Sequence, residues 1–198
     1  ENPPYADLGR QAAANAAKAF ALGKSGAGFG ARAGAYEGGL GSASVVTVEG
    51  WQVGALVAVN PFGSPYIPGT KTLWAWPWEQ NGEMGGQSLP TQKPPPHILP
   101  NDTKVGPAAN QNTTLAIVAT NVALTAAQAQ RLAIMAQDGM ARAIAPIHTP
   151  FDGDIVFALS TAKAPLPDPW PLNLTKLGSL AADCLARAIG RAVWEANK

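Results

Sequence analysis

Two adjacent threonines, Thr113 and Thr114, follow Asn112 and open a short apolar run rich in β-branched residues, TTLAIVATN. One explanation is β-propensity, because threonine fits the pleated surface of a strand. The other is that the hydroxyl of Thr113 is a nucleophile at the mouth of a strand. If the preceding peptide bond is cut, the new α-amine of Thr113, with an ordinary pKa of about 7.7–8.0, takes the hydroxyl proton near neutral pH. A lysine side chain, with an ordinary pKa of about 10.4, would need a large shift to do so.

Two aspartates, Asp152 and Asp154, flank Gly153 at the start of another apolar run, FDGDIVF. Their spacing alone favours a turn in which aspartates cap their own backbone. Two neighbouring negative charges also attract a cation, and a protonated α-amine is a natural partner where no metal site exists. Asn60 ends a further apolar strand, and its side-chain NH2 can donate to an oxyanion. Together with a cleavable junction after Asn112, these residues meet the needs of an N-terminal nucleophile.

Metal and nucleotide chemistry have weaker support. His97 and His148 lie far apart, and the chain has no cysteine pair and no HExxH motif, so no metal site is expected. Each histidine is interpreted as a surface or hydrogen-bonding residue. The segment GAGFGARAG resembles GxGxxG only superficially, because a helix precedes it and strands follow, the reverse of a dinucleotide fingerprint. No cofactor is expected.

Two further features have a structural and a functional interpretation. The segment WAWPW could bind a sugar ring or a peptide by stacking, or it could pin its loop to the body of the protein. Its candidate substrate-binding residues are Trp74, Trp76 and Trp78. Cys184 lies on the apolar side of the predicted last helix and is interpreted as an inert core residue.

The composition limits the class of protein. The chain has 198 residues, enough for one domain, and is 46% hydrophobic and 14% charged with a formal net charge of +1. This balance argues against disorder and against nucleic-acid binding. No apolar run is long enough to cross a bilayer, and the start ENPPYADLGR has neither the basic start nor the apolar core of a secretory signal. The single cysteine excludes an intrachain disulfide, and a reducing, cytoplasmic compartment fits.

The first half of the chain must position Asn60. An alanine-rich stretch predicts a helix over 6–22 that is capped by Asp7 and ends near Gly23. The glycine-rich segment 23–44 is expected to be packed and tightly turning, since it contains large side chains (Phe29, Tyr36 and Leu40). Two strands around a turn at 49–50 then end on Asn60, and the second is expected to be central. A long irregular loop follows over 62–110.

The second half must position Thr113 and the two aspartates. A strand begins at Thr113, and a capping box formed by Thr125 and Gln128 starts a helix that runs towards Ala143. A buried strand is predicted over 155–161. The last helix is predicted from 174 or 175 to 194, with an apolar face made of Leu177, Leu180, Cys184 and Ala188. This order of elements predicts an α/β sandwich with helices on a largely apolar sheet.

Three motifs in order, GLGSASVV followed by VGALVAVN, NTTLAIVATNV and HTPFDGDIVFALST, resemble the self-processing hydrolases of the L-aminopeptidase/D-amidase-esterase (S58) family. That family includes the β-peptidyl aminopeptidases and the nylon-oligomer (6-aminohexanoate oligomer) hydrolases. The resemblance covers nearly the whole chain, and the Asn-Thr junction and Asp-Gly-Asp pattern are more similar to the nylon-oligomer branch. It implies a four-layer αββα-like sandwich resembling N-terminal nucleophile hydrolases.

The resemblance also implies roles for individual residues. Thr113 matches the nucleophile that autocleavage after Asn112 exposes, so 1–112 would be the C-terminal part of an α chain and 113–198 a β chain. Asn60 matches the oxyanion-hole asparagine, and Asp152 and Asp154 match the acids near the new amino group. The expected activity is hydrolysis of linear oligoamides or short peptides. The alternatives are an aminopeptidase or amidase acting on β- or D-amino-acid substrates, and a non-catalytic scaffold that keeps the fold.

The sequence departs from the family in two ways. Family members are longer, and an N-terminal portion that holds sheet strands and part of the substrate pocket is expected to be missing here. The nylon-oligomer hydrolases also carry a lysine just after the glycine-rich segment, where this chain has Ala35. Lys24 and Arg32 are the candidate substitutes. Relatives form tetramers or larger assemblies, so a bacterial homo-oligomer with cleaved chains is expected.

Overall fold

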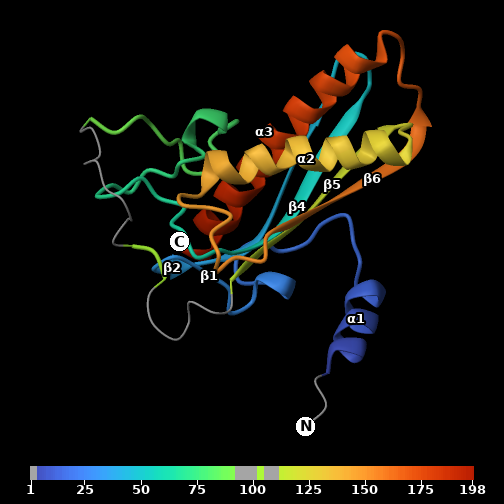
Figure 1. Cartoon of the computed structure of the whole chain (residues 1–198). Helices are drawn as coiled ribbons and strands as arrows, with labels where there is room; N and C mark the ends of the chain where they lie inside the picture. The colour runs from blue at the N-terminus through green and yellow to red at the C-terminus, as the bar shows by residue number, and fades with distance from the viewer. Residues whose placement is uncertain (1–3, 92–101, 105–111) are drawn as a thin grey trace.

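The computed structural model describes residues 4–91, 102–104 and 112–198 (Figure 1). A single four-stranded sheet and two long helices dominate this part of the chain. The elements, in chain order, are α1 (Tyr5–Ala14), η1 (Gly26–Gly28), β1 (Arg32–Ala33), β2 (Tyr36–Glu37), β3 (Gly39–Val46), β4 (Gln52–Asn60), η2 (Trp76–Trp78), β5 (Thr113–Val122), α2 (Ala126–Ala143), β6 (Ile155–Ala164) and α3 (Trp170–Ala196).

The order of strands in the main sheet is β3-β4-β5-β6. β3 and β4 form the predicted hairpin, and β4 pairs antiparallel with β5. β6 is parallel to β5, and α2 makes the crossover between them. β4 and β5 are therefore the two inner strands, which confirms the prediction that the strand ending on Asn60 is central. The register pairs Asn60 with Thr113, so two of the residues proposed from the sequence meet where these strands end and begin.

Helices α2 and α3 cover one face of this sheet (Figure 1). The strand side chains that alternate towards the helices are buried, among them Val53, Val57 and Val118. α3 approaches β3 so closely that a Cβ on Gly41 would lie 1.9 Å from the carbonyl oxygen of Ala188. Glycine at this position therefore permits contact between the helix and the strand backbone. The glycine-rich segment is packed, as expected, although Phe29 is 81% exposed.

The other face of the sheet carries apolar side chains that remain exposed in the described part of the chain. They are Leu56, Leu115, Ile117, Ile155, Phe157 and Leu159. This arrangement corrects the prediction of a buried strand over 155–161, because Val156 is the one hydrophobic side chain of β6 in the core. β6 is an edge strand, and the helices cover only one of its faces. The mixed α/β architecture is confirmed, with a four-stranded sheet, a two-stranded sheet formed by β1 and β2, and one helical layer described.

The N-terminal helix differs from its prediction. α1 ends at Ala14 instead of near Gly23, and its N-cap is Pro4, with no capping side chain. Asp7 lies inside the first turn and pairs with Arg10. None of the residues of α1 is buried, so only local interactions within the described helix support it, and an isolated short helix is marginal in water.

The two long helices follow their sequence signals more closely. Thr125 and Gln128 form the predicted capping box at the start of α2. α3 begins earlier than predicted, at Trp170, with Pro171 in its first turn, where proline is well tolerated. In the described residues, no helix combines the length and the apolar character that crossing a membrane requires.

Candidate active site

Thr113 and Asn60 lie side by side on the face of the sheet that the helices leave open. They are register partners across β4 and β5, and both line a pocket of about 390 Å³. Its other lining residues are uncharged, namely Ala27, Phe29, Gly30, Ala31, Ala58 and Leu115. The glycine-rich segment and the two inner strands therefore form one concave surface around the candidate nucleophile.

The carbonyl group of Asn112 is held from two directions. The hydroxyl of Thr113 donates to this carbonyl oxygen at 2.6 Å, and the backbone N–H of Gly153 donates to it at 2.9 Å. Gly153 lies so close that a Cβ there would be 3.0 Å from Oγ1 of Thr113. The peptide bond between Asn112 and Thr113 thus has a hydroxyl at its carbonyl and an amide donor positioned where negative charge would develop.

Asp152 is placed beside this junction by a parallel bridge to Asn112. Its Oδ1 accepts a hydrogen bond from the backbone N–H of Phe62 at 2.9 Å. Its Oδ2 accepts from the backbone N–H and the hydroxyl of Thr149, at 3.0 and 2.6 Å. Asp152 therefore caps its own turn, as its spacing predicted, and it also lies beside the Asn112–Thr113 junction. Its carboxylate joins the turn to the end of β4.

Asp154 is more deeply enclosed, with 1% of its side chain exposed. Its Oδ1 accepts from the backbone N–H of Thr114 at 2.7 Å, one residue beyond the candidate nucleophile. Its Oδ2 accepts from the backbone N–H of His148 at 3.2 Å and lies 3.0 Å from Nδ1 of the same histidine. His148 is thus a hydrogen-bonding surface residue, as interpreted from the sequence, and it touches a predicted site residue, which its sequence position did not reveal.

The side-chain amide of Asn60 has its oxygen occupied. Oδ1 accepts from the backbone N–H of Arg32 at 3.0 Å and from Nζ of Lys104 at 2.9 Å. Since both partners are donors, the network assigns this branch of the amide as oxygen and the other branch as the NH2 group. Asn60 is therefore oriented as a donor on its remaining side.

The two cations proposed from the sequence have other surroundings. Lys24 is exposed, and the guanidinium of Arg32 turns to the carbonyl oxygen of Ala35 at 2.7 Å and to Glu37 at 3.4 Å. The cation that contacts the site is Lys104, which is 7% exposed. Burial lowers the pKa of its ammonium to about 8. Sequence reasoning missed Lys104 because it lies in the irregular loop, where no periodicity distinguishes one residue from another.

The three tryptophans lie elsewhere. They lie in and next to η2, which packs against α3, and Trp78 contacts the core and the guanidinium of Arg142 at 5.5 Å. The residues that line the pocket beside Thr113, as far as the structure describes them, include none of Trp74, Trp76 and Trp78. These contacts support the interpretation that the tryptophans pin their loop to the body of the protein.

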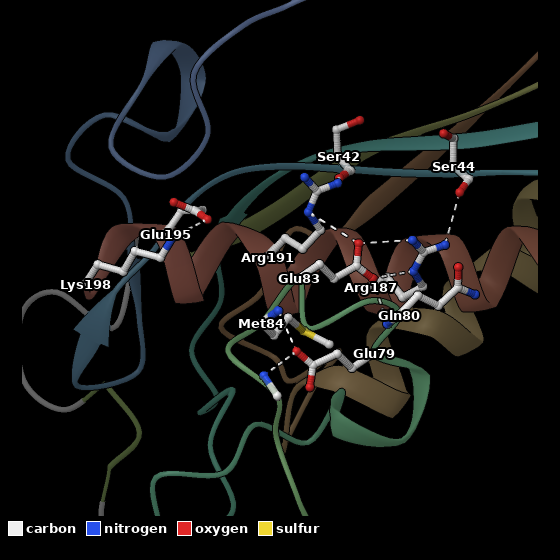
Figure 2. A network of polar contacts seen from close by, with 11 residues as sticks. Ser42, Ser44, Glu79, Gln80, Glu83, Met84, Arg187, Arg191, Glu195 and Lys198 are labelled. Atoms are coloured by element: carbon white, nitrogen blue, oxygen red, sulfur yellow. Dashed lines mark hydrogen bonds and ion pairs between the residues drawn. The ribbon is translucent and has the colours of Figure 1, made fainter.

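Ion pairs fasten the same loop to the helical layer (Figure 2). Arg187 of α3, which is 6% exposed, donates to Glu83 through Nε at 2.6 Å and through a terminal nitrogen at 3.0 Å. It also donates to the carbonyl oxygen of Ser44 at 3.1 Å, while Arg191 contacts Glu83 at 3.6 Å. Arg187 is therefore the point where the loop, α3 and the edge strand β3 meet.

The structure also places Cys184 and bears on the expected absence of a metal site. Cys184 is buried in the core, and burial raises the pKa of its thiol to about 11, which suits an inert residue. Among the described residues, no group of three or more histidine, cysteine, aspartate or glutamate side chains could hold a metal ion. His97 lies outside the described residues.

Solved structures show which fold this is. The chain matches a β-aminopeptidase of Burkholderia sp. with a TM-score of 0.64 and an L-aminopeptidase D-Ala-esterase/amidase of Ochrobactrum anthropi, a variant of the Ntn hydrolase fold, with 0.61. Each match is 24% identical and covers 92% of this chain but 49% and 47% of the other. A further match, the PH0078 protein of Pyrococcus horikoshii, has a TM-score of 0.63 at 28% identity. The fold of the chain is thus that of an N-terminal nucleophile hydrolase variant.

Sequence relatives include proteins named as peptidases and oligoamide hydrolases. An uncharacterized aminopeptidase of Mycobacterium tuberculosis is 39% identical over 207 residues, which cover 98% of this chain and 58% of that protein. A 6-aminohexanoate-oligomer endohydrolase of Kocuria sp. is 32% identical over 98 residues, 46% of this chain and 26% of that protein. The chain therefore spans little more than half the length of its mycobacterial relative. The profile of peptidase family S58 matches residues 6–198, and the chain belongs to that family.

Proposed function

We propose that this protein is an amide-bond hydrolase whose nucleophile, Thr113, becomes N-terminal when the chain cuts itself after Asn112. The observation that carries the proposal is the contact of the Thr113 hydroxyl with the carbonyl of Asn112, at 2.6 Å, with the Gly153 N–H on the same oxygen. Membership of peptidase family S58 supports amide hydrolysis as the reaction class.

The proposed self-cleavage has two steps, which these contacts support. Oγ1 of Thr113 attacks the carbonyl carbon of Asn112, the C–N bond breaks, and the hydroxyl proton passes to the departing α-amine, which leaves an ester. Water then hydrolyses the ester, giving the carboxylate of Asn112 and the free hydroxyl of Thr113. The N–H of Gly153 stabilises the negative charge that collects on the carbonyl oxygen in both steps.

Substrate hydrolysis reuses the same hydroxyl. The α-amine of Thr113 accepts the hydroxyl proton, Oγ1 attacks the substrate carbonyl, the C–N bond breaks, and the proton passes to the leaving amine. Water then hydrolyses the acyl ester on Oγ1, which releases the acid and restores the hydroxyl of Thr113. Asn60 donates its NH2 group to the oxyanion, and removal of one such donor typically slows a reaction by about 100- to 1000-fold. Asp152 and Asp154 place negative charge beside the start of β5, where it orients the new ammonium group.

The test is the mass of the chain and its first residues. A purified preparation should contain two fragments, one of which starts TTLAIVATN, and Thr113→Ala should yield one uncut, inactive chain. Thr114→Val is the matched control, because the adjacent Thr114 is fully buried and its hydroxyl has no hydrogen-bond partner within the described structure. An uncut wild-type chain with full activity, or an active Thr113→Ala variant, contradicts the proposal.

The proposed substrates are linear oligoamides or short peptides, and the uncharged lining of the pocket beside Thr113 suits their neutral amide groups. An aminopeptidase activity is the second candidate, because relatives that match nearly the whole chain carry that name. Rates on an N-blocked oligoamide and on a free-amine dipeptide amide separate the two. An endo-acting hydrolase cleaves both, whereas an aminopeptidase needs the free amine. Sedimentation of the cleaved protein tests the expected homo-oligomer.

A further inference from the structure

Lys104 is a buried cation with a specific target. Its side chain is almost fully enclosed, and its Nζ donates to two oxygens of one residue, Oδ1 of Asn60 at 2.9 Å and the backbone oxygen of Asn60 at 3.2 Å. Its own backbone N–H donates to the carbonyl oxygen of Phe62 at 2.9 Å. The lysine is thus anchored to the segment that follows β4, and its charged end closes on the residue that ends β4.

This contact determines which branch of the Asn60 amide is the donor. Rotation of the amide by 180° would place its NH2 group against Nζ of Lys104 and the N–H of Arg32, which are both donors. It would also turn the amide oxygen towards the oxyanion, where it repels negative charge. A hydrogen bond from a charged donor is roughly twice as strong as one between neutral groups, so Lys104 contributes more to this orientation than the Arg32 amide does.

The ammonium also acts through its charge. A cation on Oδ1 polarises the amide, which makes the NH2 group a stronger donor. Two charged groups act on Lys104, Asp152, which favours its protonated form, and Arg32, which disfavours it. Because the effect of burial outweighs that of Asp152, the pKa of Lys104 falls to about 8. The charge that Lys104 places on Asn60 is therefore lost within an accessible pH range.

We propose that Lys104 is a positioning residue for hydrolysis, in which its ammonium holds Oδ1 of Asn60 and thereby presents the NH2 group of Asn60 to the oxyanion. This inference rests on the proposed function, since it requires Asn60 to serve the oxyanion of a Thr113-catalysed reaction. This role differs from the one suggested from the sequence for Lys24 and Arg32, which is to replace the lysine of the nylon-oligomer hydrolases as an activating base.

The experiment compares Lys104→Met with the wild type after both are shown to be cleaved, using kcat and KM on an N-blocked oligoamide between pH 6 and pH 10. Lys104→Met should lower kcat by about 10- to 100-fold, less than loss of the oxyanion donor itself, with KM changed by less than about threefold. The α-amine of Thr113 titrates in both enzymes, so their comparison isolates the effect of Lys104. Relative to Lys104→Met, the wild-type kcat should show an alkaline fall as the pH rises through about 8, because deprotonation removes the charge that Lys104 places on Asn60. Lys104→Met should lack this alkaline fall.

Two further variants keep the test decisive. Lys104→Arg keeps the cation, so it should retain more of kcat than Lys104→Met and should move the alkaline fall to higher pH. Lys71→Met, which removes an exposed lysine, should leave kcat and its pH profile unchanged. Circular dichroism tests whether each variant is folded. If Lys104→Met is unfolded, the pH profile of kcat for Lys104→Arg tests the inference instead. A cleaved, active enzyme whose Lys104 variants keep the wild-type kcat and pH profile overturns this inference and leaves the proposed function intact.

Discussion

The two faces of the four-stranded sheet differ in burial, although neighbouring residues of the same strands form both of them. On the covered face, small and aliphatic side chains pack under α2 and α3 and are almost fully buried. On the open face, Thr113 and Asn60 line a pocket, and apolar side chains such as Ile117 and Leu159 are half exposed. Because side chains alternate along a strand, β4 and β5 supply both faces at once, and a slip of one residue would exchange them. We therefore expect mutations on the covered face to change stability and mutations on the open face to change the proposed chemistry.

The largest effect on stability should come from the ion pair that fastens the tryptophan-rich loop to the covered side. Glu83→Ala leaves Arg187 buried without its carboxylate, and loss of one partner of a buried pair costs about 3–5 kcal/mol of unfolding free energy. Urea titration followed by tryptophan fluorescence measures the loss. Asp7→Ala, which breaks the exposed pair on α1, should cost less than about 1 kcal/mol. Equal losses in the two variants would mean that Glu83 is solvated.

The next largest loss of stability should come from a mutation in the core between α3 and the sheet. Leu185 is fully buried, and Leu185→Ala should lower the free energy of unfolding by about 2–5 kcal/mol through lost transfer energy and the cavity that remains. Thermal melting and urea titration report the change. The fraction of chain that is cleaved at a temperature well below the melting point should stay at the wild-type value, and a loss of cleavage there would show that the two faces are coupled.

A change beside Thr113 should have a smaller effect, which slows self-cleavage and leaves the free energy of unfolding unchanged. Gly153→Ala places a methyl group 3.0 Å from Oγ1 of Thr113, a distance that pushes the hydroxyl by a few tenths of an ångström. Such a displacement should slow cleavage by about tenfold, or about 1.4 kcal/mol in the activation barrier. A time course of fragment formation on denaturing gels measures it. Gly54→Ala, where the nearest atom lies 3.7 Å away, is the control and should cleave at the wild-type rate.

The smallest effect should follow from trimming the open face. Leu159 of β6 is 51% exposed, so Leu159→Ala should cost about 1 kcal/mol or less, because much of its side chain gains little from folding. The same substitution at Leu185 gives the direct comparison, measured under the same conditions. A cost at Leu159 as large as that at Leu185 would show that another surface covers the open face in solution.

Local signals predicted much of this fold. The capping box of Thr125 and Gln128 and the β-branched run after Thr113 are each encoded within a few residues, and both lie where the sequence placed them. The sequence also put Asn60 and Thr113 at strand ends, but only the register shows that they are partners. The predicted length of α1 and the predicted burial of β6 were wrong, because both properties depend on which other elements pack against them. Lys104 could not be found, since its contact with Asn60 joins residues 44 positions apart.

The ladder between β4 and β5 has a particular consequence if the chain is cut after Asn112. β3 and β4 then belong to one polypeptide and β5 and β6 to the other, and their register runs from Val53–Thr120 to Asn60–Thr113 through the middle of the sheet. The interior of a single domain becomes the interface of a heterodimer, in which each product chain supplies half of the sheet. Separation of the products would break this ladder and expose the core, so native mass spectrometry should find one assembly where denaturing conditions find two chains.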